Sequence, residues 1–267
     1  MGLTGAVAAL RGAVGFLSRL PVGNTKDGWE AFRRTPAAMP AVGYALGALV
    51  ALPVVAAALS PVRVPAATVA VAFPAWLYLV TGITHLDGVA DVGDAAVVHG
   101  DDDRRREVLK DSALGVGGTL ALSLTVVALA AGATAVAELA RLSLVDAVLL
   151  VVVAEVGAKA ATATLVCVGD APHEGLGSAL TEASGPRALG RVALVTAPAA
   201  LLGWPVLRFG AVAPSLAVLA AAVVVAALAF AWARARLGGV SGDVLGATNE
   251  LARVAGLHVG VIAWTLS

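Results

Sequence analysis

The chain has 267 residues, of which 59% are hydrophobic and 13% are charged, and its 18 basic and 18 acidic side chains give a net charge of zero. Charged residues make up about a quarter of an average soluble domain, so roughly half the usual share is present. Together with repeated long apolar runs, this composition excludes an ordinary soluble domain and indicates an integral membrane protein. The single cysteine, Cys167, excludes an intramolecular disulfide and does not suggest a cysteine-based metal site.

The first element in the chain is a predicted amphipathic helix within residues 1–23. Its apolar residues alternate spacings of four and three, which places them on one helical stripe. These residues are Leu3, Val7, Leu10, Val14 and Leu17. Because Arg11 and Arg19 interrupt the apolar run, the segment does not resemble a signal peptide. We expect the helix to lie at the membrane interface or against the bundle, and a first spanning helix is the alternative.

Seven apolar segments follow, and most are long enough to cross a bilayer. They lie at about 37–59, 64–84, 115–137, 143–166, 188–206, 212–233 and 251–266. Polar stretches lie at 24–36, 85–114, 167–187 and 234–250. The predicted fold is therefore all-α: a polytopic membrane bundle of six to seven transmembrane helices plus the N-terminal amphipathic helix. With no internal repeat or linker, residues 1–267 are expected to form a single membrane-embedded domain.

Basic residues are distributed unevenly between the two sides of the predicted bundle. Two spans separate each polar stretch from the next, so all four stretches fall on one side. That side carries Arg11, Arg19, Lys26, Arg33, Arg34, Arg104, Arg105, Arg106, Lys110, Arg187, Arg191, Arg234 and Arg236. The other side carries Arg63, Arg141 and Arg208. Because basic residues in short loops mark the cytoplasmic face, we expect the polar loops to face the cytoplasm from the inner cell membrane.

The longest polar stretch begins with Asp87, Asp91 and Asp94, at positions i, i+4 and i+7. On a helix these positions fall within about 60° of one another. Carboxylates stacked on one face repel, and a divalent cation such as Mg²⁺ would compensate while keeping substrate phosphates as further ligands. We therefore predict a metal site at these three residues. The alternative is a solvated helix start, where the helix dipole favours aspartate.

Charged and glycine-rich residues continue this stretch. The run of aspartates and arginines at 101–106 is usually a solvated face, although a guanidinium also suits a phosphate. The glycines at 115–118 precede a spanning helix, where backbone N–H groups can bind an anion, but glycines are also common at helix contacts in membranes. The candidate substrate ligands are Arg104, Arg105, Lys110, Asp111, Ser112 and Gly117.

Two later polar stretches add further candidates. His173 and Glu174 lie in the stretch 167–187, where a lone histidine is more often structural than a ligand. In the glycine-rich stretch 234–250, Asp243 and Glu250 could be brought to a metal or act as a base, and a flexible inter-helix turn is the alternative. The candidate substrate ligands here are His173, Glu174, Gly242 and Asn249.

One charged pair, Glu155 and Lys159, lies inside a predicted span at i and i+4. Charges at that depth are costly unless they pair or face a polar cavity. The pair is therefore either a neutralising contact within the bundle or the wall of a polar cavity below an active site.

Several blocks resemble the cobalamin synthase family, also called adenosylcobinamide-GDP ribazoletransferase. They are FLSRLPVG at 16–23, LDGVADVGDAA at 86–96, LKDSALGVGG at 109–118, HEGLG at 173–177 and GGVSGDVLGATNE at 238–250. The blocks extend over nearly the whole chain in the order of the family. The aspartate block at 86–96 and the glycine block at 238–250 are together specific.

The resemblance implies a Mg²⁺-dependent transferase of cobalamin biosynthesis. Adenosylcobinamide-GDP and α-ribazole, or its 5′-phosphate, would give adenosylcobalamin, or its phosphate, and GMP. Asp87, Asp91 and Asp94 would hold the metal, and the implied catalytic residues are Asp91, Asp94, Asp243 and Glu250. The bilayer is an expected partner and nucleic acid is not, while contact with other pathway enzymes and the oligomeric state stay open.

Two alternative functions are compatible with the same residues. The aspartate block also resembles the CDP-alcohol phosphotransferases, which break a similar anhydride. A small membrane permease could use Glu155 and Lys159 as an intramembrane relay. The permease hypothesis does not explain why the Gly-Asp motifs gather on one side of the membrane.

Overall fold

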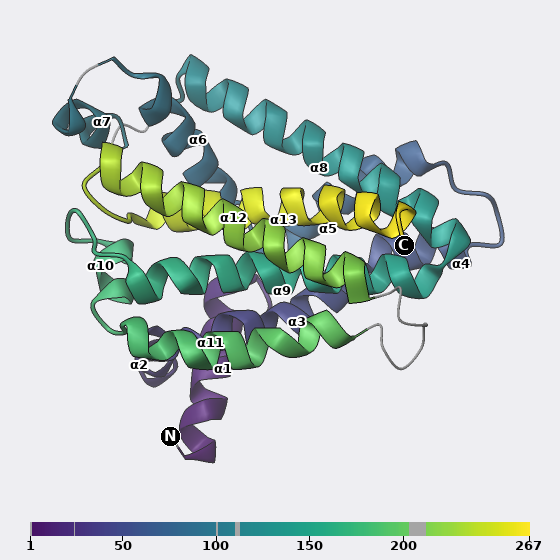
Figure 1. The fold of residues 1–267 in the computed structure, drawn as a ribbon, viewed down its shortest axis with the longest axis horizontal. Helices are drawn as coiled ribbons and strands as arrows, with labels where there is room; N and C mark the ends of the chain where they lie inside the picture. The colour runs from purple at the N-terminus through teal and green to yellow at the C-terminus, as the bar shows by residue number, and fades with distance from the viewer. Residues whose placement is uncertain (1, 24, 100, 110–112, 203–211) are drawn as a thin grey trace.

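The computed structural model describes residues 2–23, 25–99, 101–109, 113–202 and 212–267, and the side chains of residues 102 and 103 are not described. Over these ranges the chain is helical and contains no strand (Figure 1). The long helices α8, α9, α12 and α13 run side by side along the molecule, and the short helices α2, α7 and α10 lie toward one end (Figure 1). The predicted all-α fold class is confirmed.

The helices appear in the following order along the chain. They are α1 (Leu3–Leu17), α2 (Lys26–Arg33), α3 (Ala38–Val50), α4 (Leu52–Leu59), α5 (Ala66–Thr81), α6 (Thr84–Val97), α7 (Asp102–Val108), α8 (Val116–Leu142), α9 (Leu144–Val168), α10 (Leu176–Thr181), η1 (Pro186–Ala188), α11 (Leu189–Thr196), η2 (Ala197–Leu201), α12 (Val212–Arg236) and α13 (Gly242–Thr265). The elements η1 and η2 are 3₁₀ helices.

Helix α9 forms the centre of the bundle and packs against α3, α12 and α13. Most of its residues are buried, including the pair Glu155 and Lys159. Gly43 and Gly47 of α3 let the two backbones touch: a Cβ at Gly47 would lie 2.7 Å from the Cα of Val152. Such small-residue contacts are how helices associate where lipid removes the hydrophobic drive.

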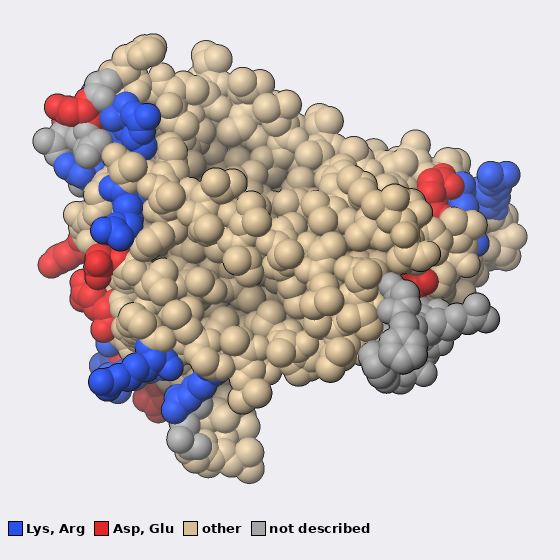
Figure 2. Space-filling view, viewed as in Figure 1, with Lys and Arg blue, Asp and Glu red and all other residues tan. Residues whose placement is uncertain are grey.

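An apolar band separates two charged ends. On the face shown in Figure 2, charged side chains lie at both ends and none lie in the broad band between them. Among the described residues, α3 with α4, α8 and α12 are long and apolar enough to span a bilayer, and a fourth span is possible if α5 and α6 count as one. The predicted helical membrane bundle is confirmed, but the three or four candidate spans among the described residues are fewer than the six to seven predicted.

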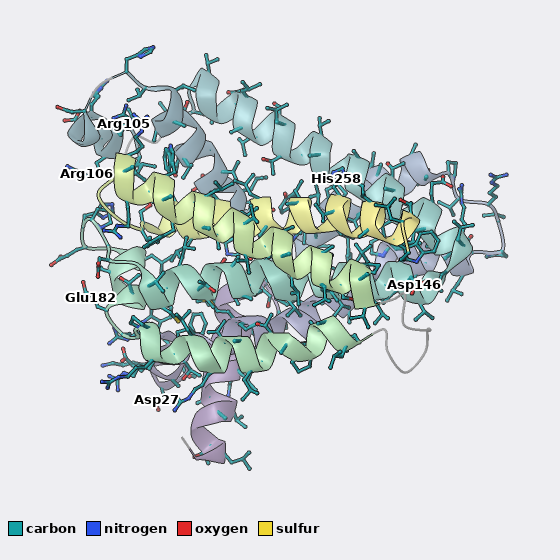
Figure 3. The ribbon with its side chains drawn as sticks, viewed as in Figure 1. Asp27, Arg105, Arg106, Asp146, Glu182 and His258 are labelled. Atoms are coloured by element: carbon teal, nitrogen blue, oxygen red, sulfur yellow. The ribbon has the colours of Figure 1, made fainter. Side chains whose placement is uncertain are left out.

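The short helices place most polar segments at the same end of the molecule. Asp27 of α2, Arg105 and Arg106 of α7 and Glu182 after α10 lie at this end, and Asp146 of α9 lies at the opposite end (Figure 3). The structure therefore brings the predicted polar stretches to one side, which we call the polar end.

Helix α1 has the predicted bounds of an amphipathic helix but buries a different face. Ala9 and Ala13 are buried against the bundle together with Leu17, the last member of the predicted apolar stripe, whereas Leu3, Val7 and Leu10 of that stripe are exposed. The small residues face inward because α1 packs closely on α2 and α3. The exposed apolar stripe is left free to contact lipid.

The helix expected through Asp87, Asp91 and Asp94 is confirmed as α6, and the polar stretch 85–114 also contains α7. Two other predicted segment boundaries are wrong. The stretch 234–250 is also partly helical: α13 begins at Gly242, where the Ser241 hydroxyl caps the helix by accepting from the Val244 N–H at 3.3 Å. The segment 188–206 is not one continuous helix, because Pro198 accompanies a change from α11 to the 3₁₀ element η2.

A sharp break separates α5 from the aspartate helix α6. The two helices meet at an angle of 103°. Gly82 ends α5 with φ of +78°, a conformation that glycine adopts without steric cost. Helix α6 therefore turns away from the axis of α5 instead of continuing it.

Candidate functional site

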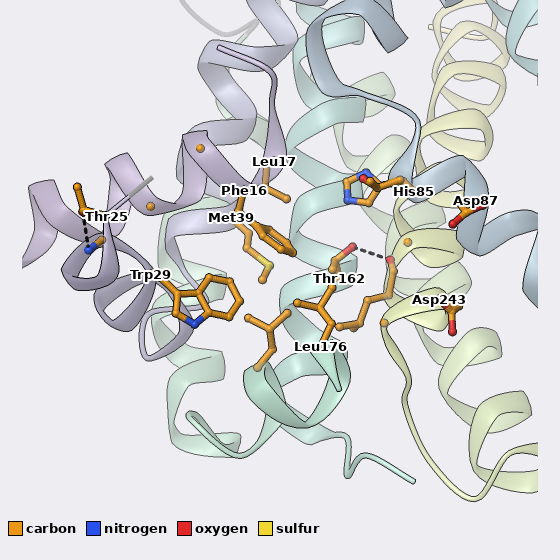
Figure 4. Close-up of a pocket in the computed structure, with 18 of the residues that line it drawn as sticks. Phe16, Leu17, Thr25, Trp29, Met39, His85, Asp87, Thr162, Leu176 and Asp243 are labelled. Carbon is orange, nitrogen blue, oxygen red and sulfur yellow. Dashed lines mark hydrogen bonds between the residues drawn. The ribbon is translucent and has the colours of Figure 1, made fainter. Parts of the chain in front are cut away.

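A cavity of about 710 Å³ opens at the polar end, between α1 and α2 on one side and α6, α10 and α13 on the other. Its volume is in the range of small-molecule sites. Figure 4 shows an aromatic wall on the side of α1 and α2, an acidic wall on the side of α6 and α13, and His85 and Thr162 between them.

The aromatic wall consists of side chains that are largely apolar. They are Phe16, Leu17, Trp29, Met39, Leu176 and Leu180. The ring centroids of Phe16 and Trp29 lie 5.5 Å apart, and both rings contact the buried ring of Phe32 at 5.3 and 6.0 Å. Packing against a buried ring fixes the orientation of both half-buried rings.

Close contact between α1 and α2 holds this wall in place. A Cβ at Gly12 would lie 2.1 Å from the carbonyl oxygen of Gly28, so the two helices cross at their glycines. The hydroxyl of Thr25 caps α2 by accepting from the Gly28 N–H at 3.1 Å. The wall is therefore a rigid helical hairpin rather than a loop.

The acidic wall forms where α6 contacts the first turn of α13. A Cβ at Gly88 would lie 2.6 Å from the carbonyl oxygen of Asp243, so only glycine allows this approach. Asp87 and Asp243 both line the cavity. Burial raises the pKa of Asp91 to about 6, and the negative charges of Asp243, Asp87 and Asp94 add to the shift. The wall therefore concentrates negative charge that its own residues do not neutralise.

Asp94 belongs to a different contact from the other aspartates. Its two carboxylate oxygens accept hydrogen bonds from the backbone N–H groups of Gly115 and Gly118, each at 2.8 Å. This carboxylate satisfies the free N–H groups at the start of α8. The predicted anion site at these glycines is thus filled by the protein's own aspartate, and Gly117 packs against the Gly93 carbonyl of α6.

The predicted three-aspartate metal site is not preformed. No three His, Cys, Asp or Glu side chains lie close enough to hold a metal ion in the part of the chain that the structure describes. Mg²⁺ usually binds proteins through one or two carboxylates and takes water and substrate phosphates as its other ligands. The exposed carboxylate of Asp87 and the half-buried ones of Asp91 and Asp243 fit that pattern.

Below the cavity lies a network of buried charged and polar side chains from α9 and α13. Arg253 forms ion pairs with Glu155 and Glu250, and Lys159 donates to Glu155 Oε2 at 3.2 Å and to Asn249 Oδ1 at 2.9 Å. All five residues are at most 1% exposed. Two acids balance two bases, so the expectation of a neutralising contact for Glu155 and Lys159 is confirmed, whereas neither residue lines the cavity.

The structure separates the two carboxylates of the third polar stretch. Asp243 lines the cavity, whereas Glu250 lies two helical turns deeper and also accepts a hydrogen bond from Tyr78 at 3.2 Å. Asn249 and Glu250 were expected in a loop, but they are buried in α13. Glu250 therefore does not line the cavity together with Asp243.

The predicted phosphate ligands fall in several places. Arg104 is exposed and pairs with Glu107 at 2.9 Å, and Glu174 is exposed. His173 and Gly242 line the cavity. Arg105 lies on α7 at the polar end (Figure 3). The predicted ligands Lys110, Asp111 and Ser112 lie outside the described residues.

Several residues at the site were missed by sequence reasoning. His85 directly precedes the aspartate motif, and Arg253 is a charge within an apolar run three residues after Glu250, so both carried a signal. Phe16 and Trp29 come from separate segments, and only the crossing of α1 and α2 brings them together. No spacing in the sequence predicts that contact.

This arrangement defines a class: a helical membrane protein with a substrate-sized, acidic and aromatic pocket at its polar end. The family model described as cobalamin-5-phosphate synthase matches residues 9–261. The chain belongs to the cobalamin-5-phosphate synthase family, so it is a transferase with a function in cobalamin synthesis. The predicted family resemblance is confirmed.

Individual relatives support the same family. A protein of Halorubrum lacusprofundi named adenosylcobinamide-GDP ribazoletransferase is 60% identical over 97% of this chain and 98% of its own length. Proteins of the same name from Haloquadratum walsbyi and Methanococcoides burtonii are 49% and 32% identical, over 97% and 98% of this chain and 99% and 95% of their own. No solved structure gives a significant match.

Proposed function

We propose that the chain joins adenosylcobinamide-GDP to α-ribazole or its 5′-phosphate, releasing GMP. The observation that carries this proposal is the pairing of an aromatic wall and an acidic wall in one cavity. The acceptor has an apolar aromatic base and a ribose hydroxyl, and the donor has a phosphate anhydride. Each wall suits one of these chemical groups, and the names of close relatives support the same reaction.

The acidic wall would receive the anhydride together with Mg²⁺, held by Asp87, Asp91 and Asp243. When bound, the cation would neutralise phosphate oxygens and the departing GMP. Two of these carboxylates line the cavity, and the raised pKa of Asp91 reflects its burial first and then the neighbouring negative charges, which a cation would compensate. Asp94 is left out of this set because both its oxygens cap α8.

Asp243 is the proposed acceptor of the hydroxyl proton. A ribose hydroxyl oxygen of the ribazole, other than the 5′-oxygen that carries the phosphate in the phosphorylated acceptor, would bond to the phosphorus on the cobinamide side. Its proton would pass to the Asp243 carboxylate, and GMP would leave with the bridging oxygen. The Ser241 hydroxyl donates to Asp243 Oδ2 at 3.2 Å and orients the carboxylate. Glu250 is less suited to this role because it is buried and ion-paired with Arg253.

The aromatic wall would hold the base of the acceptor. An apolar benzimidazole-type ring can stack on Trp29 or Phe16 without leaving polar groups unpaired, whereas guanine needs partners for its hydrogen-bonding edge. The side chains around the two rings are mainly apolar. The wall therefore favours the ribazole base over the guanine of the donor.

The polar end would face the cytoplasm from the cell membrane. Most basic residues of the chain lie in the segments gathered at that end, and the positive-inside rule applies to short loops of this kind. The donor carries a charged diphosphate and the acceptor carries polar ribose hydroxyls, so a site open to the cytoplasm can receive both without their crossing the bilayer.

The direct test is GMP release by purified protein in detergent. The protein would be given Mg²⁺, adenosylcobinamide-GDP and α-ribazole, with a parallel sample in EDTA. We expect GMP and a matching corrinoid product that require the metal and return when Mg²⁺ is restored. Well-folded protein that releases no GMP would contradict the proposal. CMP release from cytidine-activated alcohols would then support the phosphotransferase alternative, and substrate flux in liposomes the permease.

A further inference from the structure

A chain of hydrogen bonds leads from the buried network to the substrate cavity. Lys159 Nζ donates to Asn249 Oδ1 at 2.9 Å, and Asn249 Nδ2 lies 3.1 Å from Nδ1 of His85. Lys159 and Asn249 are fully buried, and the side chain of His85 is 15% exposed. His85 also lines the cavity, so it is the last member of the chain and the one that a substrate can reach.

The donor and acceptor atoms of these three residues fix the direction of each hydrogen bond. A lysine ammonium has only donors, so the amide oxygen of Asn249 must face Lys159. The Asn249 NH₂ group then faces His85, and it also donates to Glu250 Oε1 at 3.4 Å. An NH₂ group is a donor only, so Nδ1 of His85 must accept. The ring proton is thereby placed on Nε2.

The Nε2 group of His85 faces accessible space. It makes no hydrogen bond to the described residues. It is also not one of the described polar atoms that are both buried and without a partner, so Nε2 must be accessible. His85 lines the cavity (Figure 4), so the accessible Nε2 edge is the part of the ring that a ligand can reach. A fixed, solvent-accessible N–H donor remains in a pocket whose neighbouring Asp87 and Asp243 are acceptors.

We propose that the His85 Nε2–H donates a hydrogen bond to a phosphate oxygen of the bound donor substrate, and that Asn249 and Lys159 are positioning residues that hold this tautomer. The inference rests on the proposed function, because it assigns a residue to the anhydride of that reaction. A phosphate oxygen is the partner of choice because it only accepts, and a hydrogen bond to a charged group is among the stronger ones.

Two substitutions at His85 separate this role from packing. The amide nitrogen of glutamine can reach the position of Nε2, whereas asparagine reaches only the position of Nδ1. We expect His85→Gln to keep kcat/KM for adenosylcobinamide-GDP within about threefold, and His85→Asn to lower it by roughly 10- to 100-fold. The KM for α-ribazole should change little in both. Equal losses in the two variants would overturn the assignment.

A double-mutant cycle tests the positioning role of Asn249. Aspartate at this position would accept from both Lys159 and His85, so the ring proton would move to Nδ1 and the donor would be lost. We expect Asn249→Asp to lower kcat/KM roughly 10-fold or more in the wild type, but by less than about threefold in the His85→Gln background, which has no tautomer to set. Equal losses in both backgrounds would show that Asn249 is merely structural.

The two levels of the proposal fail in different ways. If wild-type protein releases no GMP, the proposed function fails. Competition between GMP and a labelled nucleotide in detergent then still tests whether His85 donates a hydrogen bond to phosphate. In that binding assay His85→Asn should weaken GMP and His85→Gln should not. If wild type turns over and His85→Asn matches it, only the role of His85 is wrong. Thermal unfolding of each variant identifies any that fail to fold, and the remaining His85 or Asn249 variant then decides.

Discussion

The carboxylate of Asp94 accepts a hydrogen bond from the backbone N–H of Gly118 at 2.8 Å, and thereby joins α6 to the start of α8. A Cβ at Gly118 would lie 2.5 Å from the same carboxylate, so the contact needs glycine. One residue of the aspartate motif and one of the glycine motif therefore form a structural pair. The aspartate motif suggested a metal site and the glycine motif suggested an anion site, but in part the two motifs bind to each other.

The first prediction concerns this cap. Asp94→Asn retains one acceptor oxygen, so one N–H of α8 loses its partner, and we expect a loss of about 1–2 kcal/mol in stability. Turnover per folded molecule should stay within about threefold of wild type. Thermal unfolding in detergent and GMP release measure the two effects, with Asp101→Asn, at the exposed cap of α7, as the control. A fully folded Asp94→Asn without turnover would instead favour the metal role.

The second prediction separates Asp91 from Asp94. Asp91→Asn should reduce GMP release by roughly 100-fold or more, because it removes a carboxylate from the proposed cation site. The stability of Asp91→Asn at pH 7.5 should not fall below that of wild type. The folded state raises the pKa of Asp91 to about 6, so the ionised carboxylate present at pH 7.5 destabilises the fold. A neutral side chain at this position removes that cost. Asp27→Asn, an exposed change on α2, is the matched control. Wild-type rates from Asp91→Asn would refute the assignment.

The third prediction concerns the aromatic wall. Trp29→Ala should raise the KM for α-ribazole about 10-fold or more, since stacking on one ring contributes roughly 1–3 kcal/mol per base. The KM for adenosylcobinamide-GDP should change less than about threefold. Trp264→Ala is the control, because that ring lies outside the cavity and bonds to Asp146 at 3.1 Å. If the KM for adenosylcobinamide-GDP rises instead, the aromatic wall binds the guanine of that substrate.

The fourth prediction concerns the buried network. Glu155→Gln removes one of the two carboxylates, Glu155 and Glu250, that balance the charges of Arg253 and Lys159. Breaking a buried ion pair typically costs about 3–5 kcal/mol. We expect a large drop in the thermal midpoint and in the yield of folded protein from membranes. Glu138→Gln breaks an exposed pair with Arg141 and should cost under about 1 kcal/mol. Similar midpoints for the two variants would show that the network contributes little.

The fifth prediction concerns orientation in the membrane. Cysteine would be introduced at Glu182, at the polar end, or at Val62, between α4 and α5. The native Cys167 is buried and should stay silent. With a membrane-impermeant maleimide on whole cells, we expect labelling of Val62→Cys alone, and of Glu182→Cys only after permeabilisation. The reverse pattern would place the polar end outside the cell.

The sequence by itself determined the class of the protein and the chemistry of its motifs. Long apolar runs require helices in lipid, because each backbone polar group must be satisfied within the segment. The asymmetry of basic residues then grouped the polar stretches, and the structure gathers the short helices that contain them at one end. The aspartate and glycine blocks also identified the family, which the comparisons confirm.

Only the tertiary structure decided which residues of those motifs share a site. Gly88 brings α6 against Asp243, and the crossing of Gly12 and Gly28 brings Trp29 to the same cavity. Asp94 turned out to cap a helix although it shares a stripe with Asp87 and Asp91, because a neighbouring helix offers two free N–H groups. Spacing along one helix fixes which side chains share a face, whereas the partner of that face depends on packing between distant segments.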